Sequence, residues 1–452
     1  MFVAREKELS QLKESFSNVN KQAILIYGKR RIGKSTLIAK AAVDFDGIVI
    51  SHICAKTTYE GNLALLSRSV CLALGLPVMN FKAIEDIFSF IENMNKRVLI
   101  IIDEYQYFKE NARDLDSRLQ SVIDRMSDNI RLVLCGSYIT MMKELLNEEN
   151  PLFGRFNLII HLEEFDYLDS AEFFKEADIR KKIENYAVFG GSPYVLATIE
   201  GMSSLKENIV KYLLPQTGVL RVYIESVMLR EIQKAYDIRI FSTIGNGKKK
   251  YSDINTSLNI GNTGLLDKQL KTLLDMEALR KLTPVNKTSD RRKQFYIISD
   301  NLMRFYFTFI FGNEALISRL GEEAYFDNYI STAIEEFISR RFEDICDQYF
   351  ARKIRAGKIT DVLDHGSYWY DDPVNKMNGE FDCVLKRRIG YDFYECKYYS
   401  SPMLIGECRK EEGQILAIQS LPVNRIGFIC SAGFEEKDEK YDMITGGELY
   451  VV

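Results

Sequence analysis

The stretch "GKRRIGKST", residues 28–36, matches the pattern GxxxxGK[ST] at every defined position. It follows the apolar run "AILIY" (23–27) and precedes the helical pattern "STLIAKAAV" (35–43). A strand, a glycine-rich loop and a helix in this order are the context in which the pattern forms a phosphate-binding loop. The stretch therefore predicts a P-loop nucleotide-binding fold built on a parallel sheet.

The side chains of this loop have separate predicted roles. Glycines let backbone N–H groups curve around phosphates, Lys34 reaches the β- and γ-phosphates, and the Ser35 hydroxyl ligates Mg²⁺. We expect ATP and Mg²⁺ as cofactors. The predicted nucleotide contacts of the loop are Gly28, Gly33, Lys34, Ser35 and Thr36.

A second apolar run, "KRVLIIIDEYQYF" (96–108), ends in two acids. An unbroken apolar run is typical of a strand buried on both faces of a parallel sheet. We interpret it as the Walker B strand, in which Asp103 holds the Mg²⁺ shell and Glu104 orients or deprotonates the attacking water. A third such strand, "IRLVLCGS", ends at Ser137.

Three further segments resemble archaeal-type ATPases related to the STAND and AAA+ groups of P-loop NTPases. "FVAREKEL" (2–9) is similar to their hhGRExE element, with Ala4 where glycine is usual, and the resemblance implies an adenine-side role for Arg5. It also implies that Ser137 senses the γ-phosphate. "PLFGRF" resembles the segment that carries their arginine finger. The resemblance implies that Arg155 is catalytic and places its charge next to a phosphate, in its own or a neighbouring subunit. The alternative is that Arg155 forms an ordinary surface salt bridge. "FGGSPYVL" (189–196) resembles their lid turn.

From about residue 239 the pattern changes to short helices followed by two strands. "SDINTSL" and "GLLDKQLKTLLDMEAL" predict two helices, with Leu266, Leu270, Leu273 and Leu274 facing a small core. "LRKLTPVNKTSDRRKQFYIIS" then predicts two strands around a basic tip, which completes the layout of a winged helix. DNA contact and a packing role remain alternatives. The candidate phosphate contacts are Lys268, Lys271, Lys287, Arg291, Arg292 and Lys293.

Near the end of the chain, "FDCVLKRRIGYDFYECK" (381–397) predicts a β-hairpin. If it folds about Arg388, Asp382 lies opposite Tyr394 or Glu395, and Glu395 shares a strand face with Lys397. Two carboxylates around a divalent cation, with a lysine beside them, is an arrangement typical of metal-dependent phosphodiester cleavage.

This hairpin resembles the PD-(D/E)xK nuclease superfamily, with "ECK" as the ExK element. The resemblance spans roughly residues 310–452 and implies Mg²⁺ or Mn²⁺ bound by Asp382 and Glu395, with Lys397 as a catalytic group. The amphipathic helix "FISRRFEDICDQYF" corresponds to the first core helix of the superfamily and supplies Glu343 as an additional metal ligand, with Glu335 as the alternative. The superfamily order of elements is αβββαβ.

Length and composition agree with a multidomain α/β protein. The chain has 452 residues, of which 46% are hydrophobic and 27% charged, and its net charge is -4. No apolar run approaches the roughly 20 residues that span a bilayer, and eight cysteines occur without CxxC pairs, so we expect a cytoplasmic protein without structural zinc. The predicted parts are a P-loop core (1–170), a helical lid (171–235), a winged helix (236–300) and a restriction-endonuclease-like domain (301–452).

Two hypotheses follow for function. The first is an ATP-controlled, Mg²⁺-dependent DNA nuclease that works alone or as a homo-oligomer, with no membrane partner. The second is a regulatory or scaffolding ATPase whose C-terminal domain binds DNA without cleaving it.

Overall fold

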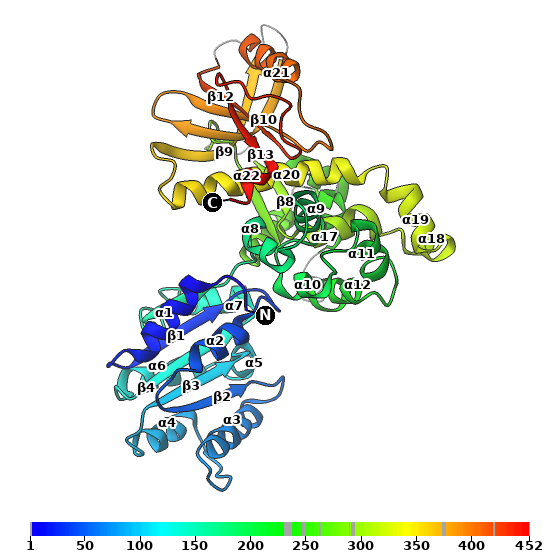
Figure 1. Ribbon diagram of the computed structural model, residues 1–452. Helices are drawn as coiled ribbons and strands as arrows, with labels where there is room; N and C mark the ends of the chain where they lie inside the picture. Colours follow the sequence, from blue (N-terminus) through cyan, green and yellow to red (C-terminus); the bar gives the residue numbers. More distant parts are fainter. Residues whose placement is uncertain are drawn as a thin grey trace. The chain divides into compact units, whose positions relative to one another are not determined.

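The chain divides into two units, Met1–Glu164 and Phe165–Val452, in this computed structural model. The structure describes residues 2–229, 237–245, 247, 249–261, 264–288, 290, 294–372, 377–418 and 421–451. One sheet is described in the first unit and two in the second, so each unit is described by itself (Figure 1). None of the helices within these ranges is long and apolar enough to cross a membrane.

A five-stranded parallel sheet forms the centre of the first unit. Its order is β2-β3-β4-β1-β5. Every residue of β1, β3 and β4 is buried, which confirms the prediction from the three continuous apolar runs. The strands are β1 (Gln22–Tyr27), β2 (Ile48–Ile53), β3 (Val98–Asp103), β4 (Ile130–Gly136) and β5 (Leu158–His161).

Helices cover both faces of this sheet (Figure 1). Successive residues of β1 alternate between the two faces: Ile24 and Ile26 pack with α1 and α2, whereas Ala23 and Leu25 belong to the core shared with α3, α4 and α6. The helices are α1 (Glu6–Ser17), α2 (Lys34–Ala42), α3 (Tyr59–Ala73), α4 (Ile84–Glu92), α5 (Gln106–Lys109), α6 (Leu115–Arg125) and α7 (Ile139–Glu144).

The second unit begins with a group of short helices that are capped by their own side chains. Asp166, Asp178 and Ser204 accept hydrogen bonds from backbone N–H groups at the starts of α8, α9 and α11. The elements are α8 (Tyr167–Ala171), η1 (Glu172–Phe174), α9 (Ile179–Phe189), α10 (Pro193–Thr198), α11 (Leu205–Tyr212), α12 (Val219–Tyr223) and η2 (Ile224–Met228).

Three helices and a small antiparallel sheet of order β6-β8-β7 follow. The two predicted helices and two predicted strands are present, and Leu266, Leu270 and Leu273 are buried as expected, with Leu274 half-buried. Arg291, Arg292 and Lys293 lie outside the described residues. The elements are α14 (Arg239–Gly245), β6 (Lys249–Lys250), α15 (Tyr251–Leu258), α16 (Leu265–Asp275), β7 (Leu279–Leu282) and β8 (Phe295–Ile298).

A helical stretch joins this small sheet to the C-terminal sheet and ends in a long helix, α20. Its π-helical turns are η4 and η5. The elements are α17 (Asn301–Phe305), η4 (Tyr306–Ile310), α18 (Glu314–Leu320), α19 (Glu322–Tyr325), η5 (Phe326–Ile330) and α20 (Ile334–Arg355).

The C-terminal sheet is mixed, with order β13-β12-β11-β10-β9. β9, β10 and β11 are antiparallel, while β11, β12 and β13 are parallel. With α20 and α21 this confirms the predicted order of one helix, three strands, a helix and a strand. α21 packs on one face through Cys408 and Ile415, and α20 packs on the other, where the rings of Phe350 and Tyr394 lie 4.5 Å apart. The elements are β9 (Val362–Asp372), β10 (Met377–Arg387), β11 (Tyr391–Lys397), α21 (Ile405–Ala417), β12 (Val423–Cys430), β13 (Asp442–Thr445) and α22 (Gly446–Leu449).

Candidate functional site

The loop between β1 and α2 requires glycine at two positions. Gly33 has φ +93, a left-handed conformation that side chains rarely adopt, and it directly precedes α2. A Cβ atom on Gly28 would lie 2.2 Å from the carbonyl oxygen of Leu162. The glycines therefore permit both the turn and its close packing, and the N–H groups at the start of α2 follow the loop, as an anion site needs.

Lys34 lies across this loop. Its side chain is 6% exposed, and its ammonium donates hydrogen bonds to the carbonyl oxygens of Gly28 and Lys29, both at 2.7 Å. A phosphate group in the loop is a stronger, charged acceptor for the same ammonium.

Ser35 and Asp103 meet where β3 ends. The Ser35 hydroxyl donates to Asp103 Oδ2 at 2.5 Å, and Asp103 Oδ1 accepts the N–H of Glu104 at 2.8 Å. A hydroxyl and a carboxylate are hard oxygen ligands of the kind that Mg²⁺ prefers, so the pair fits that ion. Burial raises the pKa of Cys54 and of Cys135, and Asp103 adds to each rise, so both thiols stay protonated beside the carboxylate.

Glu104 belongs to a hydrogen-bonded network that crosses from β3 to β4. The Ser137 hydroxyl donates to Glu104 Oε2 at 2.8 Å, and Gln106 donates to both Ser137, at 3.0 Å, and Glu104. Glu104 has φ +53. Gln106 is fully buried, and the sequence did not lead us to predict a role for it. Its position could have indicated one, because it is a polar residue within the otherwise aromatic run that follows the two acids.

The two candidate arginines both have partners within the first unit. Arg5 approaches Glu8 at 3.5 Å and donates to the carbonyl oxygen of Glu163. Arg155 forms a two-pronged pair with Asp124, at 3.0 and 3.2 Å. Asp124 therefore engages both Nε and Nη2 of Arg155.

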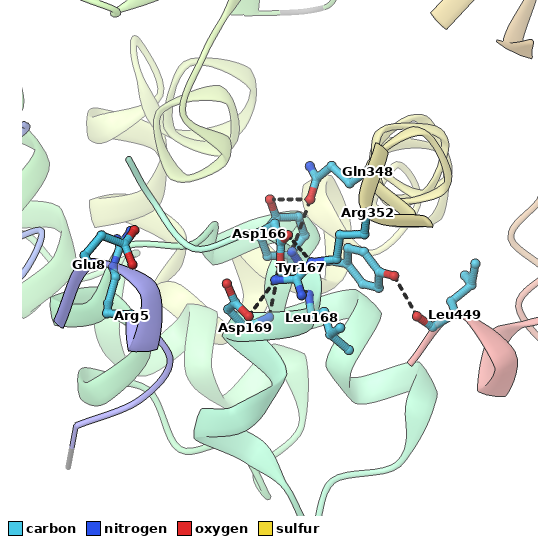
Figure 2. Close-up of polar contacts among 10 residues, drawn as sticks. Arg5, Glu8, Asp166, Tyr167, Leu168, Asp169, Gln348, Arg352 and Leu449 are labelled. Carbon is cyan, nitrogen blue, oxygen red and sulfur yellow. Dashed lines mark hydrogen bonds and ion pairs between the residues drawn. The ribbon is translucent and has the colours of Figure 1, made fainter. Parts of the chain in front are cut away.

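Ion pairs and a hydrogen bond join the start of the second unit to α20 and α22 (Figure 2). Arg352 of α20 forms ion pairs with Asp166, which caps α8, and with Asp169 at 2.5 Å. The Tyr167 hydroxyl donates to the carbonyl oxygen of Leu449 at 2.6 Å. The helices after Phe165 therefore share contacts with the C-terminal part of the chain.

In the C-terminal sheet, β10 and β11 form the predicted hairpin. Cys383 pairs with Tyr394, so Asp382 and Glu395 are the next residues on the two strands. Lys397 donates to Glu395 at 2.8 Å and lies 3.3 Å from Glu411 of α21, a residue that the sequence reasoning missed. Burial opposes the charge of Lys397, but the two glutamates outweigh it and raise its pKa above the ordinary value.

The candidate acids of α20 lie in different places. Glu343 lines a cavity of about 720 Å³ together with Asp382, whereas Glu335 is mostly exposed and lies 3.1 Å from Arg180. Glu395 and Lys397 are not among the described residues that line this cavity. Throughout the described ranges, no three His, Cys, Asp or Glu side chains converge closely enough to hold a metal ion.

The basic side of this cavity comes from β6, β7, α17 and α20. Arg304 and Arg280 hold Asp344 between them, at 2.8 and 2.6 Å. Burial opposes the charge of Asp344, but Arg280 and Arg304 hold its pKa below the ordinary value. Burial lowers the pKa of Arg341 to about 9, and Arg304 contributes to the decrease.

The fold and the loop of the first unit define a P-loop ATPase domain. Residues 2–199 match a family described as an ATPase domain predominantly from Archaea, which supports an archaeal-type ATPase in this part of the chain. Residues 306–411 match a second family, described as archaeal and bacterial proteins of unknown function.

Individual proteins are also similar to this chain, in sequence or in structure. An uncharacterized protein of Methanocaldococcus jannaschii is 28% identical over 377 residues, which is 82% of each chain. Among solved structures, the Walker-type ATPase of Pyrococcus abyssi is 18% identical with a TM-score of 0.48, and it covers 68% of this chain and 96% of its own. The ORC2 protein of Aeropyrum pernix, with ADPNP and ADP, is 15% identical with the same TM-score, covering 70% and 95%.

Proposed function

We propose that the first unit binds and hydrolyses ATP. The observation that carries this is the meeting of Lys34, the Ser35–Asp103 pair and the Glu104–Ser137 pair where β1, β3 and β4 end. Ligands of open parallel sheets bind at the carboxyl ends of the strands. Lys34 binds the phosphates, Glu104 accepts a proton from the attacking water, and Ser137 holds the Glu104 carboxylate in place.

Mg²⁺ belongs to this proposal. Ser35 and Asp103 would hold it, and when bound it offsets the negative charge of the phosphates.

The test compares three variants on the same fold. Lys34→Ala should abolish tight nucleotide binding, because the ammonium is removed, whereas Glu104→Gln should keep binding and lose about 10²-fold or more in turnover. Lys40→Ala, on an exposed position of the same helix, should match the wild type. Fluorescent-nucleotide binding and phosphate release measure the two steps. Unchanged turnover in the first two variants would show that the site lies elsewhere.

For the second unit, we propose a DNA-associated, metal-dependent nuclease domain preceded by a winged helix. The supporting observation is the hairpin itself, in which Cys383 pairs with Tyr394 and Lys397 lies 2.8 Å from Glu395. Asp382 and Glu395 would hold Mg²⁺ or Mn²⁺, which lowers the pKa of water and polarises a phosphate. Lys397 offsets the charge that develops on the scissile phosphate.

Cleavage is tested on linear, branched and single-stranded DNA, with EDTA as the metal control. Asp382→Ala, Glu395→Ala and Lys397→Ala should each lose about 10²-fold or more in rate, the size attached to one charge-stabilising group, while DNA binding changes much less. Glu436→Ala removes an exposed acid and should cleave like the wild type. Activity that survives all three substitutions would belong to another site.

A second candidate is an ATPase whose C-terminal domain binds DNA without cutting it. It is favoured by the arrangement around Lys397, which contacts both Glu395 and Glu411, and by the lack of a converged set of three metal ligands in the described ranges. Wild-type protein that binds DNA but cleaves none of the substrates would support it.

A further inference from the structure

The cavity between the small antiparallel sheet and the C-terminal sheet has a divided lining. Its volume of about 720 Å³ is within the range of roughly 300–1,000 Å³ that is usual for ligand pockets. Acids from β10 and the middle of α20 form one part. Six cationic side chains form the other: Lys249, Arg280, Lys281, Arg304, Arg340 and Arg341.

Arg341 is the unusual member of this set. Its side chain is 6% exposed, none of the described carboxylates forms an ion pair with it, and its Nε has no hydrogen-bond partner. Its one hydrogen bond goes to the carbonyl oxygen of Phe337, a residue of the same helix, and its guanidinium lies over the Phe337 ring. A buried guanidinium without a directly paired carboxylate is costly, and an anion in the cavity it lines would reduce that cost.

The charge of the lining limits what the anion can be. Among the described residues of the lining, six cations and five carboxylates give a formal excess of one positive charge, with His365 counted as neutral. Asp344 is engaged by Arg280 and Arg304, and Asp347 lies 2.6 Å from His365 Nδ1. A phosphodiester group carries a single negative charge and matches this excess, whereas a free nucleoside triphosphate carries several.

We propose that this cavity binds one phosphodiester group of a nucleic-acid strand, with Arg341 as the buried anchor and Lys249 and Lys281 as outer contacts. The proposal deepens the proposed nuclease function, since Asp382 lines the same cavity. Binding of a phosphodiester in this cavity does not depend on cleavage, so the binding proposal and the nuclease proposal can fail separately.

The experiment measures binding of the full chain to fluorescent single-stranded and duplex oligonucleotides by anisotropy, in EDTA and without ATP, from roughly 50 to 200 mM salt. Each phosphate that a variant no longer neutralises should lower the salt slope by about 0.7 for single strands and 0.9 for duplex, and weaken binding about fivefold and eightfold near 0.1 M salt. We expect this for Arg341→Met, Lys249→Gln and Lys281→Gln. Lys358→Gln removes the same charge from an exposed turn outside the cavity and should leave slope and affinity unchanged.

The two lysine variants decide the question if Arg341→Met fails to fold. If both behave like Lys358→Gln, the proposal is wrong. A second outcome would also overturn it, and this is measured in chains that carry Lys34→Ala. If these chains still bind ATP, and Lys249→Gln or Lys281→Gln weakens that binding but not the binding of the oligonucleotide, the cavity takes a free nucleotide instead. A wild-type protein that shows the expected slopes but cuts nothing would refute the nuclease proposal and leave this one standing.

Discussion

Asp344→Asn should strongly destabilise the second unit, although the asparagine side chain has nearly the same size and shape. Asp344 accepts hydrogen bonds from Arg304 at 2.8 Å and from Arg280 at 2.6 Å, and the Arg304 side chain is 7% exposed. The substitution leaves a buried guanidinium without its counter-ion. Loss of one partner of a buried pair costs about 3–5 kcal/mol. Because Arg280 is 42% exposed and solvent screens its share, we expect about 2–4 kcal/mol in the free energy of unfolding.

Glu335→Gln is the matched control on the same helix. It breaks an exposed pair with Arg180, in which the Glu335 side chain is 73% exposed, and should cost no more than about 1 kcal/mol. Urea unfolding at pH 7 is followed by far-UV circular dichroism and by proteolysis of the second unit, because two units need not unfold together. A cost for Asp344→Asn within about 0.5 kcal/mol of that for Glu335→Gln would refute the reasoning.

The pH dependence has a defined sign. The pKa of Asp344 is lowered in the folded chain, so its contribution is fully present above the unfolded-state value of about 3.9 and is lost as the pH falls towards the folded-state value. The difference between the wild type and Asp344→Asn should therefore be constant from about pH 5 to 7 and shrink only below about pH 4.

Three other predictions concern separate parts of the chain. Arg155→Ala should lose ATP turnover while keeping nucleotide affinity, with wild-type specific activity rising with protein concentration; a constant specific activity in a range where the protein self-associates would contradict a role across subunits. Replacing residues 291–293 with alanine should weaken DNA binding similarly for all sequences and lower the salt slope by about one for each phosphate that is no longer bound, whereas an unaltered slope would indicate a packing role. Arg352→Met should lower the free energy of unfolding of the second unit by about 1–3 kcal/mol, because its pairs with Asp166 and Asp169 are only partly exposed, and an unchanged urea midpoint would rule this out.

The sequence by itself determined those features that depend on neighbouring residues. Three continuous apolar runs predicted buried parallel strands, and the spacing of GKRRIGKST predicted the loop, because backbone conformation and the strand period of two are local properties. The hairpin followed for the same reason: a short turn fixes which residues face each other, and Cys383 pairs with Tyr394.

Contacts between distant segments were decided only by the tertiary structure. The hydrogen bond from Gln106 to Ser137 spans 31 residues and exists because β3 and β4 are adjacent in the sheet. Glu411 reaches Lys397 only because α21 packs on that face of the sheet. The cavity around Arg341 joins segments from Ile244 to Asp382. Periodicity reports which face of an element is buried, but the partner on that face is chosen by the packing of the whole unit.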